Sequence, residues 1–276
     1  MLESLSYPYM QRALVAGIMV GGLCALVGVY VVLKGMSFIG AGISHASLGG
    51  IAIGLATGIE PIVTSSIFCI LVAWGIGLVS RYGKVKEDTA IGIFFTFAES
   101  IGILVISSMR NYQPDLLSYL FGSIIAVSIQ DILIAGVASL VICTAIKVFF
   151  KDLMFITFDP EMATVVGLPT NKLYFMLITI IAITIVVSIK VVGIVLVSAL
   201  IVTPAAAAQQ ISSDIRKLMA ISVIFGMGSC LLGLLLSDIF GVVPGAAIVA
   251  VSTTLFAVCA LISPIRRSLR QKEQRS

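Results

Sequence analysis

The sequence predicts an all-α membrane protein that crosses the bilayer several times. Of its 276 residues, 59% are apolar and 11% carry a charge, and the mean hydropathy is +1.18. A soluble domain of this size needs a larger share of charged residues to cover its surface. Apolar runs of about 20 residues, the length of a spanning helix, recur along the chain. They lack the alternation of barrel strands, so helices must satisfy the backbone hydrogen bonds in lipid.

Nine stretches are long and apolar enough to be candidate spans. In chain order they are 13–33, 36–57, 62–80, 89–108, 132–150, 173–189, 191–211, 218–235 and 243–263. The first has no clear cleavage site, so we expect it to remain as a helix rather than to be removed as a signal sequence. The second is rich in glycine and could instead be partly re-entrant. We therefore expect eight or nine transmembrane helices.

Basic residues collect in four regions outside these stretches. The regions are 81–86, 147–151, 216–217 and the tail 266–275, and such regions remain on the cytoplasmic side of a membrane. An even number of candidate spans separates each region from the next, which agrees with one common side. Nine spans place the N-terminus outside, and a re-entrant second stretch places it inside. A shorter apolar stretch, 116–128, is expected on the outer side as an interfacial or re-entrant segment.

The chain is expected to form a single transmembrane domain over residues 1–276. It has no Pro/Gly/Ser-rich linker and no long soluble insertion. Its five cysteines stand singly in apolar stretches, which indicates packing residues rather than disulfides or a thiolate metal site. Gly50, Gly54 and Gly58 follow a small-xxx-small spacing that permits close helix approach. Packing within the chain is the plain interpretation of these glycines, and a glycine-lined translocation path is the alternative.

A short helix is predicted in the cytoplasmic region after the fifth candidate span. Asp159 can cap it, Pro160 suits the first helical position, and Glu161 favours the positive end of the helix dipole. Gly167, followed by Pro169, ends it. The basic tail 266–275 is expected to favour anionic lipid headgroups, and nothing in it indicates binding of nucleic acid.

Four sets of residues, spread over most of the chain, resemble the motifs of one family. They are 36–40 (MSFIG) with 43–46 (ISHA), 87–92 (EDTAIG), 159–163 (DPEMA) with 167–169 (GLP), and 191–197 (VVGIVLV) with 203–206 (TPAA). On these residues the chain resembles the integral-membrane permease subunit of bacterial ATP-binding-cassette (ABC) importers for divalent metals, the zinc, manganese and iron group.

The resemblance implies a permease dimer, for which we expect two identical copies, in the bacterial plasma (inner) membrane. Two cytoplasmic ABC ATPase subunits and an external metal-binding protein would complete the transporter. The chain has no G-x-x-x-x-G-K-[ST] loop for nucleotide, so it is expected not to be an enzyme and ATP hydrolysis is expected in a separate chain. We expect no permanently bound cofactor, and Zn²⁺ somewhat ahead of Mn²⁺ and iron as the transported ion.

The resemblance also assigns a partner to the short cytoplasmic helix. It implies that this helix docks in a cleft of the ATPase and passes nucleotide-driven closure to the spans. An ordinary connecting helix on the membrane surface is the alternative. The residues concerned are Asp159, Pro160, Glu161, Met162, Ala163 and Gly167.

His45 is the chain's one histidine and the strongest candidate metal ligand, because a neutral imidazole binds zinc or manganese and is buried more cheaply than a fixed charge. In the family an aspartate usually stands four residues earlier, and here that position is Ala41. Glu99, near the middle of the fourth span, could replace it. A protonated or hydrogen-bonded glutamate between helices is the alternative for Glu99, and a structural hydrogen bond is the alternative for His45.

Pro204 lies within the seventh candidate span, where it removes a helical hydrogen bond, so we expect a static kink or a moving gate there. A rival function is a stand-alone secondary metal transporter coupled to an ion gradient, with Glu99 and His45 as a proton relay. Transport by this chain without any ATPase would distinguish the two.

Overall fold

The computed structural model describes residues 7–83, 85–109 and 127–273, with side chains as far as residue 263. All regular structure in these ranges is helical, and nine of the helices are long and apolar enough to cross a membrane. They are α1 (Pro8–Leu33), α2 (Ile39–Thr57), α3 (Pro61–Tyr82), α4 (Glu87–Ser108), α6 (Ile129–Val148), α9 (Thr170–Val192), α10 (Ile194–Ile211), α11 (Ile215–Phe240) and α12 (Pro244–Glu273). The all-α prediction is confirmed.

The described helices decide between the two helix counts. The glycine-rich α2 is an unbroken helix of 19 residues, long enough to span rather than to re-enter, so nine spans fit the described residues and eight do not. Combined with the basic regions, nine spans place the start of α1 outside. Most of the stretch 116–128 lies outside the described residues.

Proline and glycine set several helix boundaries. Pro8 and Pro61 occupy the first positions of α1 and α3, where a missing N–H costs nothing. Gly58 and Gly241 follow α2 and α11 with φ of 74° and 64°, the left-handed conformation that commonly ends a helix. These signals explain why the helices extend beyond the apolar runs.

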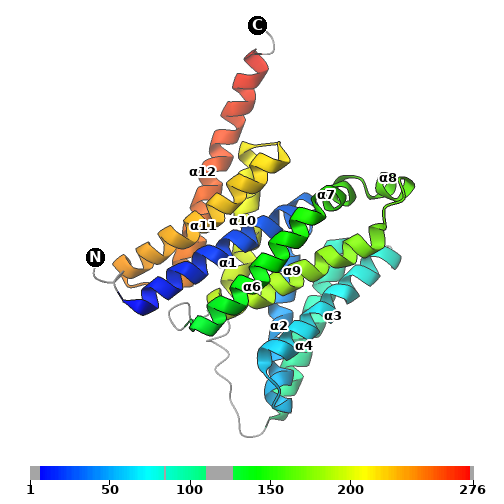
Figure 1. Ribbon diagram of the computed structural model, residues 1–276, viewed down its shortest axis with the longest axis vertical. Helices are drawn as coiled ribbons and strands as arrows, with labels where there is room; N and C mark the ends of the chain where they lie inside the picture. Colours follow the sequence, from blue (N-terminus) through cyan, green and yellow to red (C-terminus); the bar gives the residue numbers. More distant parts are fainter. Residues whose placement is uncertain (1–6, 84, 110–126, 274–276) are drawn as a thin grey trace.

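Two short helices follow α6, on the side that the basic regions predict to be cytoplasmic. They are α7 (Phe150–Phe158) and α8 (Pro160–Val165), and α8 stands at the edge of the molecule, beyond the end of α9 (Figure 1). The sequence predicted α8 but treated the residues of α7 as a connection.

The centre of the bundle is built on α1, α9 and α10, and α1 and α10 approach closely at a glycine. A Cβ at Gly28 on α1 would overlap the carbonyl oxygen of Ile201 on α10. Gly50 and Gly54 of α2 face α3 in the same way, and a Cβ at either would overlap Ser65 or Thr64. The packing interpretation of these two glycines is therefore confirmed.

By contrast, α2, α3 and α4 form a group to one side of the bundle (Figure 1). Within its most apolar window, α4 is 22% buried, against 67% for α9. The outer face of α4 is therefore free to meet lipid or another chain, while its inner face packs on α2 and α3.

Candidate functional site

The site lies between α2 and α4, which approach closely because glycines face each other across the contact. A Cβ at Gly42 would come within 2.7 Å of the Ile91 side chain, and one at Gly49 within 2.8 Å of the Ala98 carbonyl oxygen. On the opposite helix, a Cβ at Gly102 would lie 3.1 Å from the Cα of Gly49. This close packing brings the polar side chains of the two helices together.

His45 on α2 and Glu99 on α4 meet at this contact, as the sequence analysis expected. Their Nδ1 and Oε1 atoms are 3.6 Å apart, and the side chains are 31% and 37% exposed. The separation is too long for a strong hydrogen bond, and the buried Nδ1 has no hydrogen-bond partner among the described residues. An imidazole nitrogen and a carboxylate oxygen therefore stand side by side with a gap between them.

The separation is close to that of two ligands of one metal ion. Two ligand atoms about 2.1 Å from one ion in tetrahedral geometry lie about 3.4 Å apart. The 3.6 Å separation of His45 and Glu99 is close to that value. The described residues contain no group of three or more His, Cys, Asp or Glu side chains able to hold an ion, so these two would supply a weak, incomplete ligand set.

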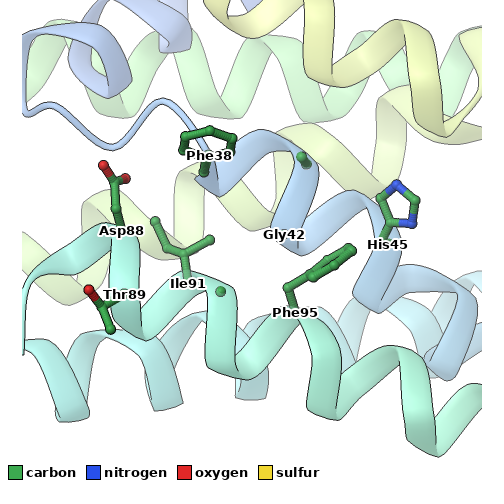
Figure 2. Close-up of a pocket in the computed structure, with 9 residues that line it drawn as sticks. Phe38, Gly42, His45, Asp88, Thr89, Ile91 and Phe95 are labelled. Carbon is green, nitrogen blue, oxygen red and sulfur yellow. The ribbon is translucent and has the colours of Figure 1, made fainter.

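A cavity of about 550 Å³ runs from His45 along the same two helices. Figure 2 shows His45 at one end and Asp88, at the start of α4, at the other. Apolar side chains line much of the space between them, and the ring of Phe95 meets the imidazole edge-on at a centroid distance of 5.0 Å. Ala41 lines the same cavity, so the missing aspartate of the family would have pointed toward this space.

Asp88 and Thr89 also line the cavity, at its cytoplasmic end. The sequence analysis did not assign them to the site, because acidic residues in the first turn of a helix are usually explained by the helix dipole. Asp88 and Thr89 line the same cavity as Gly42 only because α2 and α4 pack together. The distance between these residues along the sequence gives no sign of that packing. The cavity therefore has a carboxylate near each end.

The predicted cytoplasmic helix is formed as expected. The Asp159 Oδ1 accepts a hydrogen bond from the Met162 N–H at 2.9 Å, and Pro160 and Glu161 occupy the first turn of α8. Gly167 follows with φ of 89°. Ala163 of α8 is buried. Three apolar side chains are exposed at and beyond this helix, namely Met162 at 51%, Val165 at 79% and Val166 at 64%.

Pro204 is buried inside α10 and is not among the residues that line the α2–α4 cavity. The structure therefore does not bring it together with His45 and Glu99. Its expected role as a kink or gate stays a prediction.

Comparison with known proteins identifies the family. The family model for the ABC 3 transport family matches residues 6–263. The chain belongs to the ABC 3 transport family.

Relatives of this ABC 3 permease are similar over nearly their whole length. The manganese transport system membrane protein MntC of Halalkalibacterium halodurans is 38% identical, with 95% of this chain and 90% of the relative covered. A probable iron transport system membrane protein of Haemophilus influenzae is 34% identical, with 96% and 98% covered. The solved structure of PsaBC from Streptococcus pneumoniae in complex with Fab has a TM-score of 0.85 and 32% identity, covering 97% of this chain and 96% of that one.

Proposed function

We propose that the chain is the permease of an ABC importer that moves a divalent metal ion, Mn²⁺ first, into the cytoplasm. The observation that carries the proposal is the pairing of His45 and Glu99 at 3.6 Å at the end of a cavity that leads toward the cytoplasm. An ion released from this pair would pass Phe95 and reach Asp88. On this proposal residues 1–276 act as one transmembrane permease domain.

The choice of ion follows from ligand chemistry and from the relatives. Imidazole and carboxylate serve manganese, iron and zinc alike, so His45 and Glu99 do not select among them. Relatives carry the names of manganese or iron transport systems, and zinc is absent from those names. We therefore move Mn²⁺ ahead of the Zn²⁺ expected from sequence, with iron next.

Weak binding suits this task. Two ligands per chain hold an ion far less tightly than the four of a structural zinc site, so the ion can leave toward the cytoplasm. Water or the same pair from a second copy of the chain would complete the coordination. High affinity would then belong to a separate, external metal-binding protein.

The partners follow from the same division of labour. The exposed apolar side chains of α8 form a surface for a cytoplasmic ABC ATPase subunit, which would hydrolyse ATP. The exposed face of α4 would meet a second copy of the chain, so that two His45–Glu99 pairs approach one path. The complex would lie in the bacterial plasma membrane, and the permease itself would carry no permanent cofactor.

The test is metal uptake by the complete transporter in proteoliposomes. We expect ATP-dependent uptake of Mn²⁺ by the parent and a loss of uptake of at least tenfold in E99Q and in H45N. Thr144→Val, on an exposed part of α6 away from the α2–α4 cavity, is the control and should transport normally. Transport by E99Q equal to that of the parent across pH would refute the ligand role.

A second arm separates the importer from a secondary transporter. The permease alone, without ATPase subunits, is given a proton or sodium gradient and external Mn²⁺. The proposal requires no accumulation in these vesicles. Uphill uptake by this chain alone would overturn it.

A further inference from the structure

Beside the metal pathway, a buried tyrosine joins four helices at their cytoplasmic ends. Tyr174 of α9 is 1% exposed, and its hydroxyl donates a hydrogen bond to Glu87 Oε1 of α4 at 3.1 Å. Two cations lie over its ring: the Arg81 guanidinium of α3 at 4.6 Å from the centroid and the Lys34 ammonium, just after α1, at 5.4 Å. One anion and two cations thus surround one aromatic ring.

Lys34 and Arg81 also contact the two helices on either side of α8, namely α7 and α9. The Lys34 Nζ donates to the carbonyl oxygen of Ile156 on α7 at 3.4 Å, and Arg81 donates to Asn171 in the first turn of α9. The pKa of Lys34 is below its usual range because burial disfavours the charged form, an effect that Glu87 opposes and Arg81 reinforces. The Glu87 carboxylate therefore partly offsets the unfavourable burial of the Lys34 ammonium.

A further hydrogen bond connects α8 to the first turn of α9. The hydroxyls of Thr164, on α8, and Thr170, at the start of α9, are 3.1 Å apart. Tyr174 follows Thr170 by four residues, one helical turn along α9. A displacement of α8 therefore reaches Tyr174 through a short and well-packed part of the chain.

On the other side of the hydrogen bond, Glu87 begins the helix that lines the metal pathway. Its neighbour Asp88 lines one end of the cavity. Glu99, twelve residues after Glu87 on the same helix, faces His45. The main packing of α4 is against α2 and α3, and the hydrogen bond from Tyr174 joins its first residue to α9.

We propose that the Tyr174–Glu87 hydrogen bond is the link that passes movement of α8 to α4, and so to the metal site. The inference rests on the proposed function. Tyr174 and Glu87 are positioning residues, since neither touches the ion. Lys34 and Arg81 lie over the Tyr174 ring and hold it in place.

The test measures metal import and ATP hydrolysis together in the complete reconstituted transporter. Y174F removes the hydroxyl and keeps the ring. We expect basal ATP hydrolysis within about twofold of the parent and metal moved per ATP lowered roughly tenfold, as expected for loss of a hydrogen bond to a charged group. E87M, which has no oxygen acceptor, should show the same loss, and Y174F/E87M should be no worse than either single variant, because all three lack the same hydrogen bond.

The matched control lies one turn further along α9. The Thr179 Oγ1 accepts a hydrogen bond from the Trp74 indole N–H of α3 at 2.9 Å, and this bond does not involve α4. T179V therefore removes a hydrogen bond of similar length that joins α9 to α3. The metal moved per ATP should stay as in the parent.

The outcomes separate the two proposals. A parent complex whose ATP hydrolysis and import ignore metal would refute the proposed function. A parent that responds to metal, with Y174F and E87M keeping the parent ratio of metal moved per ATP or with effects that multiply in the double variant, would overturn the link alone. If Y174F fails to assemble, E87M decides, because it removes the acceptor and nearly keeps the size of the side chain at the start of α4. Failure of both to assemble would also overturn the link, since it would show a structural role.

Discussion

The Lys190 ammonium of α9 lies 2.6 Å from the Asp131 Oδ1 of α6. The aspartate side chain is 10% exposed and the lysine 43%. The second oxygen of Asp131 accepts hydrogen bonds from the backbone N–H and the hydroxyl of Ser128, at 3.0 and 2.7 Å. Asp131 thus caps its own helix and fastens it to α9 at the outer end of the bundle.

Removing the lysine should destabilise the protein more than removing both partners. K190M leaves the mostly buried Asp131 carboxylate without its cation, and we expect a loss of about 1–3 kcal/mol, reduced from a fully buried pair because Lys190 is partly exposed. K190M/D131N should recover part of this loss, since no charge is then left unpaired. Thermal unfolding of the purified permease in detergent measures both, and a double variant less stable than K190M would contradict the prediction.

A carboxylate at position 41 should rescue the loss of Glu99. Ala41 and His45 line the same cavity and stand one helical turn apart on α2, so the carboxylate in A41D would lie beside the imidazole. We expect A41D/E99Q to regain at least half of the parent's Mn²⁺ uptake, while E99Q alone loses at least tenfold.

The control for this rescue is A41N/E99Q, which has a similar side chain without the charge. It should stay inactive, because a neutral amide is a poorer ligand for a divalent ion than a carboxylate. Equal uptake by A41N/E99Q and A41D/E99Q would show that volume, and not a metal ligand, is restored.

The contact between α1 and α10 should tolerate no side chain at Gly28. A Cβ there would overlap the backbone of Ile201, which cannot move by changing a rotamer, so G28A should destabilise the protein by about 3 kcal/mol. Gly228 of α11 has open space where its Cβ would be, and G228A should leave stability unchanged or raise it by up to about 1 kcal/mol. Unfolding temperatures of the two variants compare them directly, and equal values would contradict the close approach.

Loss of the cap on α8 should weaken binding of the ATPase. D159A removes the acceptor for the Met162 N–H and should cost the short helix about 1 kcal/mol, while D159N keeps a capping side chain. We expect less ATPase subunit to co-purify with D159A than with D159N, at equal amounts of permease. Equal recovery would mean that docking does not depend on the order of α8.

The spans could be predicted from sequence because the requirement for long apolar helices in lipid is nearly independent of tertiary detail. Hydropathy left α2 uncertain, since its glycines resemble those of a re-entrant segment, and only the unbroken helix decides it. It also ended the fifth candidate span at residue 150 and did not predict α7, whose buried Leu153, Met154 and Ile156 follow two charged residues and form too short an apolar stretch to span.

The candidate site was predictable only in part. His45 and Glu99 stood out because ionisable residues are rare within apolar spans, and the structure places them together. Asp88 and the Tyr174–Glu87 bond did not stand out, since residues near helix ends have many ordinary reasons to be polar. Their partners depend on which helices are neighbours, and hydropathy carries no information on that.

A single residue, Gly193, connects α9 to α10. Its φ of 86° and ψ of 164° fall in a region open to glycine almost alone, and a connection this short leaves no slack for the two helices to slide apart. Movement of α9 relative to α10 is then mainly a tilt about this point. With 23 residues, α9 is about 35 Å long. A small tilt of the helix at Gly193 therefore displaces its opposite end, next to α8, by several ångströms.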